Sequence, residues 1–130
     1  MGTFRMEQAT TDVALDKIAA LANEIWHEHF VPIIGLDQVN YMVGKFQSYP
    51  ALKDQVKEGY EYYRIFCGDA FAGYAGIRPE EDALFLSKLY LHKDYRGQHL
   101  STKALEFLKD YCHKHGLTKI WLTCNKYNSH

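Results

Sequence analysis

The feature that most constrains the fold is a change in the spacing of apolar residues after Gly59. The runs "YEYYRIFC", "AFAGYAGI" and "ALFLSKLYL" follow one another, separated by Gly68–Asp69 and by "RPEED". Short runs rich in aromatic and apolar residues, bounded by glycine, proline and acidic residues, are typical of β-strands. Residues 60–91 are therefore predicted to form a three-stranded meander.

Helical spacing precedes and follows this meander. A first helix is expected from Asp12, ending by Val31 at the latest because of Pro32, and further short helices are expected in "DQVNYMVGKF" and "PALKDQVKEG". After the meander, "STKALEFLKDYCHKHG" returns to helix, and "KIWLTCN" is typical of a buried strand. With "FRMEQAT" as a first strand, the predicted order is βααβββαβ, an α/β fold in a single domain over residues 1–130.

Composition limits the compartment and the partners. The net charge of −1 over 130 residues does not favour a bulk electrostatic nucleic-acid binder. Cys67, Cys112 and Cys124 are widely spaced and form no CxxC pair, which favours a reducing compartment over a disulfide scaffold or a zinc site. No apolar run approaches the ~20 residues of a membrane span. We expect a cytoplasmic protein with no nucleic-acid or membrane partner.

The segment "LYLHKDYRGQHLSTKAL", Leu89–Leu105, joins a strand to a helix through a polar turn. The first N–H groups of a helix have no partner within the helix, and the helix dipole adds positive charge there. Glycine lets a phosphate approach the backbone, and Arg96 and Lys103 add charge. The joint is predicted to bind an anion, although it matches neither the P-loop pattern nor GxGxxG.

The segment "LSKLYLHKDYRGQHLSTKALEFL" resembles the acetyl-CoA loop of the GNAT superfamily of N-acetyltransferases, whose signature is Q/R-x-x-G-x-G/A. Arg96 falls on the first position, His99 and Ser101 replace the two glycines, and Gly97 occupies a free position. The resemblance extends to "YYRIFCGDAFAGYAGI" and "IWLTCNKYN", and "IWHEHFVPIIGLDQVNYMVGKFQS" looks like a subgroup of small bacterial acetyltransferases. It implies a mostly antiparallel central sheet flanked by helices.

The resemblance implies acetyl-CoA as co-substrate, a small-molecule or peptide amine as acceptor, and no metal. Peptide groups of Leu89 and Leu91 would pair with the pantetheine arm, and Asn128 would contact the cofactor near its reactive end. The pyrophosphate would be held by backbone amides of the loop: Arg96, Gly97, Gln98, His99, Leu100, Ser101 and Thr102. The alternative is a non-catalytic CoA-binding or regulatory module that kept the loop and lost the chemistry.

The catalytic residues stay unassigned. A base, often a glutamate, is sought early on the family's fourth strand, but "ALFLSKL" offers only Ser87 and Lys88, so Glu28 and Glu61 are left as candidates. The family continues beyond the position of His130 with a tyrosine-bearing helix and two strands. We therefore expect an incomplete domain whose open strand edge, Ile120–Leu122, pairs with a second chain as a homodimer.

Three residue patterns have simpler structural explanations. The "HEH" at 27–29 and the pair His113 and His115 do not fit HExxH, and histidines two apart on a helix point to different faces. The aromatic residues of the meander could stack on bases but suit sheet packing better. An apolar helix face is more often core than acceptor pocket, and this applies to three residues at family pocket positions: Trp26, Phe30 and Tyr41.

Overall fold

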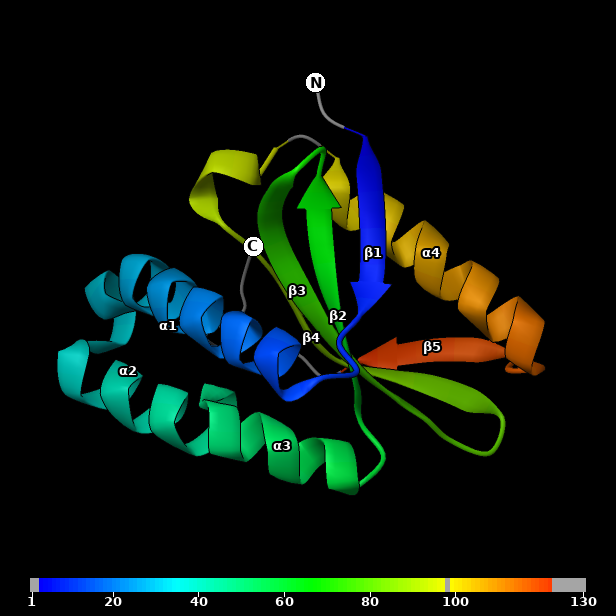
Figure 1. Cartoon of the computed structure of the whole chain (residues 1–130), viewed down its shortest axis with the longest axis horizontal. Helices are drawn as coiled ribbons and strands as arrows, with labels where there is room; N and C mark the ends of the chain where they lie inside the picture. The colour runs from blue at the N-terminus through cyan, green and yellow to red at the C-terminus, as the bar shows by residue number, and fades with distance from the viewer. Residues whose placement is uncertain (1–2, 98, 123–130) are drawn as a thin grey trace.

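The computed structural model, which describes residues 3–97 and 99–122, has five strands in one sheet, arranged in their sequence order (Figure 1). The strands are β1 (Phe4–Gln8), β2 (Glu61–Cys67), β3 (Ala70–Pro79), β4 (Ala83–Leu91) and β5 (Lys119–Leu122). Neighbouring strands from β1 to β4 are antiparallel, while β4 and β5 are parallel. The predicted meander and the mostly antiparallel mixed sheet are confirmed.

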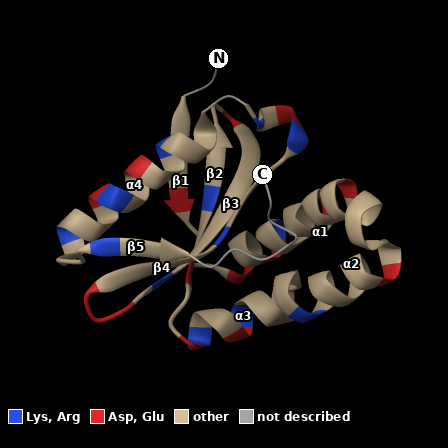
Figure 2. Cartoon of the chain, turned by 180° about the vertical axis from the view of Figure 1, so that it is seen from behind, with Lys and Arg blue, Asp and Glu red and all other residues tan. Residues whose placement is uncertain are grey.

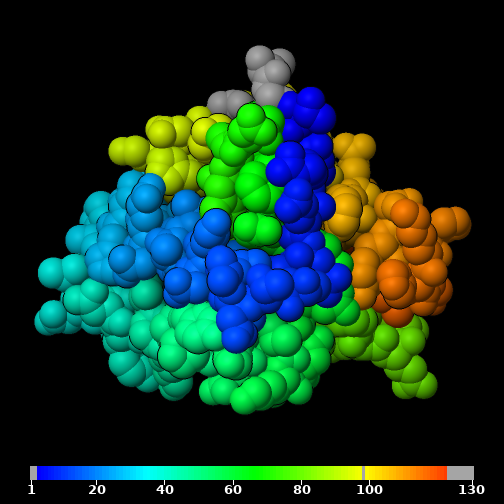
Figure 3. Space-filling model, viewed as in Figure 1, coloured from blue at the N-terminus to red at the C-terminus, as the bar shows by residue number. Residues whose placement is uncertain are grey.

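Helices cover both faces of the sheet. On one face lie α1 (Asp12–Ile34), α2 (Leu36–Met42), the π-helical turn η1 (Val43–Gln47) and α3 (Tyr49–Lys57), and α4 (Leu100–His115) covers the other. The space-filling view shows α1 and α3 packed side by side (Figure 3). Acidic and basic residues are interspersed along α3 and α4 and form no continuous basic stripe on these helices (Figure 2).

Strand alternation divides the core between the two faces. On β2, Tyr62 packs under α1 and α3, whereas Tyr63 and Ile65 pack under α4. The same alternation on β4 sends Leu84 and Leu86 toward α4. A third apolar cluster fills the α1–α2 corner and consists of Trp26, Phe30, Val39 and Val43.

Helix α1 runs through Pro32, so the prediction that it ends by Val31 is wrong. A proline inside a helix removes the bond to the carbonyl four residues earlier, and here that loss falls in the last turn. Gly35, with φ of 89°, ends the helix and donates its N–H to the carbonyl of Val31 at 2.9 Å. The N-terminal region thus contains one long helix of 23 residues before two short ones.

Strand β5 is less buried than its sequence predicted. Leu122 is 54% exposed, and Trp121 stacks on Phe85 with its indole N–H donated to Glu80 at 2.8 Å. The reason is position: in the described part of the chain β5 is the last strand of the sheet and pairs only with β4. The expectation of a buried strand is corrected to a partly exposed edge strand.

Candidate active site

The joint between β4 and α4 has an unusual backbone. After Leu91 the chain makes the 3-10 turn η2 (Lys93–Tyr95), and Gly97 and His99 then take left-handed conformations with φ of 79° and 62°. His99 is the only residue other than glycine with positive φ in the described part of the chain. A side chain with a Cβ disfavours this conformation, so the turn imposes it at a cost typical of functional loops.

The start of α4 leaves backbone N–H groups available. Helix α1 is capped by Thr11, which accepts from the N–H of Ala14 at 3.1 Å, and α3 is capped in the same way by Ser48. The cap residue of α4 is His99, and its side chain accepts no such bond. The helix begins at Leu100, so the first-turn N–H groups of Leu100, Ser101 and Thr102 are free of a side-chain cap.

A cavity of about 330 Å³ opens at this helix start. It is lined by residues from α1, from the end of β4 and from the joint: Ile25, His29, Leu89, Tyr90, Leu91, Arg96, Gly97 and Ser101. Five of these are residues that the sequence proposed for the cofactor. Sequence reasoning missed the other three, Ile25, His29 and Tyr90, although the spacing of four places Ile25 and His29 on one face of α1.

The other proposed residues lie in different places. Leu100 is buried against the sheet, and Thr102 and His99 are exposed at the helix start. Gln98 and Asn128 lie outside the described residues. Glu61 faces α4, where it accepts hydrogen bonds from Tyr111 at 3.1 Å and from Tyr63 at 3.3 Å. It is therefore on the opposite face of the sheet from α1.

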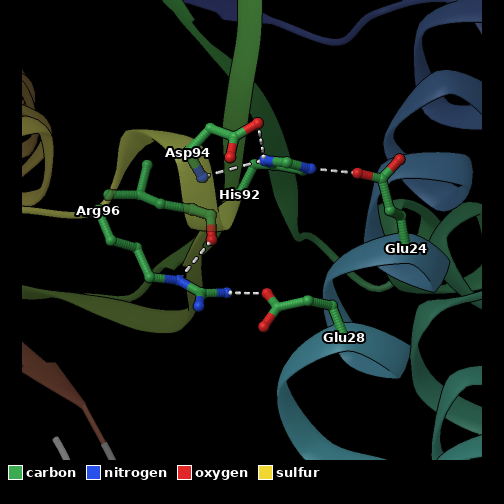
Figure 4. Close-up of polar contacts among 6 residues, drawn as sticks. Glu24, Glu28, His92, Asp94 and Arg96 are labelled. Atoms are coloured by element: carbon green, nitrogen blue, oxygen red, sulfur yellow. Dashed lines mark hydrogen bonds and ion pairs between the residues drawn. The ribbon is translucent and has the colours of Figure 1, made fainter.

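Two acidic side chains on α1 hold the joint (Figure 4). Arg96 pairs with Glu28 at 3.0 Å through its guanidinium and donates Nε–H to the carbonyl of Leu91 at 3.0 Å. One turn earlier, Glu24 pairs with Nε2 of His92, whose Nδ1 accepts from the N–H of Asp94 at 3.2 Å. These two pairs, called the α1 clamp below, fix the turn, and Glu28 offsets part of the positive charge of Arg96.

Strand β4 changes its pairing just before the cavity. Gly76 of β3 is opposite Lys88 while Ile77 is opposite Leu86, so Ser87 forms a bulge. Strand β5 pairs with β4 only over Ala83–Leu86 within the described residues. From the bulge onward, the described part of β5 no longer pairs with this edge of β4. A ligand with amide groups can therefore pair with β4 there.

For the three aromatic residues at family pocket positions, the core interpretation is confirmed for Trp26 and Phe30 and is wrong for Tyr41. Trp26 and Phe30 are buried core residues that contact Tyr90, and Tyr41 is exposed. His27 bonds to the carbonyl of Asn23 and to Asn40. Within residues 3–97 and 99–122, no group of three His, Cys, Asp or Glu side chains is arranged to hold a metal ion.

Residues 18–130 match the family model described as the Acetyltransferase (GNAT) family. The chain belongs to this family. GNAT membership makes it an acyltransferase. A search of curated protein sequences finds no match.

Solved structures show the same fold at low identity. The PaiA N-acetyltransferase of Thermoplasma acidophilum, solved with coenzyme A, superposes with a TM-score of 0.82 at 16% identity, over 98% of this chain and 82% of that one. An aminoglycoside acetyltransferase from an uncultured soil sample, solved with sisomicin, gives 0.64 at 9% identity, over 95% and 78%. A Bacillus halodurans C-125 protein described as a transcriptional regulator gives 0.68 at 16% identity, over 97% and 85%.

No described helix is both long and apolar enough to cross a membrane.

Proposed function

We propose that this GNAT protein moves an acetyl group from acetyl-CoA to an amine of a small molecule or peptide. The observation that carries the proposal is that one cavity reaches both the edge of β4 and the uncapped start of α4. An elongated ligand with a phosphate group at one end and an amide-bearing arm at the other matches these two features. The coenzyme A bound to the Thermoplasma acidophilum protein of the same fold supports this choice.

The pyrophosphate takes the start of α4. Its anionic oxygens accept from first-turn N–H groups, and the left-handed turn at Gly97 and His99 lets the backbone approach them. Ser101 lines the cavity at the same place, and Gln98 is proposed with these residues from the family motif.

The pantetheine arm follows β4. Its amides pair with peptide groups of Leu89 and Leu91, which line the cavity past the bulge. Because the pyrophosphate lies beyond Leu91 in the chain, the arm runs back toward lower residue numbers. The thioester is therefore placed near Ser87 and Lys88, with Asn128 proposed at the same end of the cofactor.

The chemistry is direct attack of a neutral amine on the thioester carbonyl. A primary amine has a pKa near ~10, so it must lose a proton first. The oxyanion that forms needs a donor, and a backbone N–H at the β4 bulge suits this role. The wide spacing of the three cysteines, with no CxxC pair, supports a reducing, cytoplasmic location.

A charge placed at the helix start tests the site. Ser101→Glu is expected to weaken CoA binding by at least about tenfold, because a carboxylate competes with the phosphate for the same N–H groups while leaving the helix intact. Isothermal calorimetry with CoA measures the effect. Gln38→Glu, an equal charge change on the exposed face of α2, is the matched control and should bind as the wild type does.

Turnover separates the enzyme from a binding module. Thiol release from acetyl-CoA is measured with spermidine, sisomicin, lysine and an alanyl dipeptide as amine probes. Acetylated product from any of them is the expected result. CoA binding without thiol release from the whole panel would identify a non-catalytic CoA-binding module, and wild-type affinity in Ser101→Glu would refute the assigned site.

A further inference from the structure

Lys88 is a buried lysine that the proposed binding of acetyl-CoA does not use. It lies on β4, is 8% exposed, and points toward η1 and α3. Its Nζ donates to the carbonyl of Phe46 at 2.6 Å and to Oε1 of Gln55 at 3.0 Å. Phe46, whose carbonyl accepts from Nζ, is itself 38% exposed.

A row across three strands builds this position. Tyr62, Gly76 and Lys88 are opposite one another on β2, β3 and β4. A Cβ on Gly76 would lie 2.8 Å from the ring of Tyr62, so only glycine lets that ring lie across β3. The Tyr62 ring centroid is then 5.2 Å from the amine of Lys88, and its hydroxyl donates to Oε1 of Gln55.

The surroundings favour a neutral amine. The groups that face Nζ from β2, α3 and η1 are a tyrosine, a glutamine and a backbone carbonyl, and none of them carries a negative charge at neutral pH. Burial lowers the pKa of Lys88 to about 7. A neutral amine has two N–H groups, which the two acceptors satisfy, and one lone pair that stays available to accept a proton.

The two carboxylates suggested by the sequence are engaged elsewhere. Glu28 is paired with Arg96, and Glu61 accepts from Tyr111 on the opposite face of the sheet. Lys88 instead adjoins the Ser87 bulge, where the proposed cofactor path places the thioester. This step rests on the proposed function.

We infer that Lys88 is the general base that takes the proton from the acceptor amine. The acceptor ammonium gives one proton to the lone pair of Lys88, directly or through one water, and becomes a neutral amine. Its nitrogen attacks the thioester carbonyl, a C–N bond forms and the C–S bond breaks. The second proton of that nitrogen goes to the leaving thiolate to give the thiol of CoA, and Lys88 returns its proton to solvent.

The test compares pH profiles of acetyl transfer. Lys88→Met keeps an unbranched side chain, one atom shorter, that has no nitrogen to accept a proton, and Lys88→Arg keeps a positive charge that it cannot release. In Lys88→Met, Gln55 Oε1 still accepts from Tyr62 and the Phe46 carbonyl still accepts from Gln55 Nε2 at 3.2 Å, so folding should be retained. The control is Lys57→Met, an exposed lysine on α3.

The profile is measured with the amine probe that is acetylated fastest. In the wild type, kcat/KM for this amine should rise through pH 7 and then level off, because the pKa of Lys88 is about 7. Both Lys88 variants should lose a factor of about 10² to 10⁴ at pH 7. The kcat/KM of Lys88→Met should not level off above pH 7 but should keep rising toward the pKa of the amine. CoA affinity by calorimetry should stay within about twofold of the wild type, which separates loss of a base from loss of structure.

Three results would overturn the inference. The first is a Lys88→Met profile with the wild-type limb and rate. The second is acetyl found on Lys88 by mass spectrometry after incubation with acetyl-CoA, which would make the amine a nucleophile. The third is a wild-type protein that binds CoA but acetylates none of the amine probes. This third result would also refute the proposed acetyl transfer, whereas the first two would refute only the role of Lys88.

Discussion

At the scale of single residues, His99 is the position where the sequence departs most from the family motif. Its left-handed backbone explains why the motif has glycine there. The residue caps α4 with φ of 62°, a conformation that glycine adopts without penalty. We expect His99→Gly to be more stable than His99→Ala by about 1 kcal/mol, because both remove the imidazole and only alanine retains the Cβ. Urea unfolding of the two variants measures this difference.

The same pair of variants tests whether the imidazole binds the cofactor. If His99 acts only through the backbone, His99→Gly keeps or improves CoA affinity. A loss of more than about tenfold in both variants would show that the ring contacts the ligand. Equal stability of the two variants would instead show that the turn is not left-handed in solution.

Contacts distant in sequence explain what residue patterns could not predict. The strand, turn and helix around Arg96 are local, so the joint could be predicted from the chain itself. The partner of Arg96 is Glu28, 68 residues away, and the acceptors of Lys88 are 42 and 33 residues away. Only the packed fold brings such groups together, which is why Lys88 could not be distinguished from a surface lysine by sequence.

At the scale of elements, the α1 clamp connects a helix to the turn before α4. Glu28→Gln removes the carboxylate beside Arg96 while keeping its size. We expect CoA to bind up to about fivefold more tightly, corresponding to the ~1 kcal/mol of a partly exposed ion pair, because the guanidinium is then no longer offset near the phosphate. Calorimetry at low and high salt measures it, and the gain should shrink as salt screens the charges.

Glu24→Gln is the matched control for this change. Glu24 lies one turn earlier on α1 and pairs with His92, not with Arg96. Its loss should alter CoA affinity less than the loss of Glu28. Weaker binding in Glu28→Gln would contradict the expectation and show that the pair positions Arg96 for the ligand.

The elements themselves differed in how well sequence predicted them. The meander over β2, β3 and β4 was predicted because alternation and turn residues are local properties. The end of α1 and the exposure of β5 were not, since the first depends on the late position of Pro32 in the helix and the second on the place of β5 in the sheet. The π-helical turn η1, which supplies the carbonyl to Lys88, has no recognisable sequence signal.

At the scale of the whole molecule, buried titratable side chains make folding depend on pH. Lys88 has a folded pKa of about 7, against 10.5 for an exposed lysine. Between these values the unfolded chain carries the proton and the folded chain does not, so the unfolded state binds more protons and stability rises with pH. Burial raises the pKa of Tyr62 and Tyr74, so above pH ~10 unfolded tyrosines ionise first and stability falls again.

We therefore expect the wild type to gain stability from pH 7 to pH 9, with the contribution of Lys88 approaching a tenfold change in the unfolding constant per pH unit. Lys88→Met should lose this slope and be more stable than the wild type at pH 7, because an apolar side chain replaces an amine that resists burial as a cation. Urea unfolding at pH 7, 8 and 9 measures both, and Lys57→Met should keep the wild-type slope. Identical slopes in the wild type and Lys88→Met would mean that Lys88 stays charged when folded. A lysine that is charged at neutral pH has no lone pair for a substrate proton, so that one result would remove the base as well as the pH dependence.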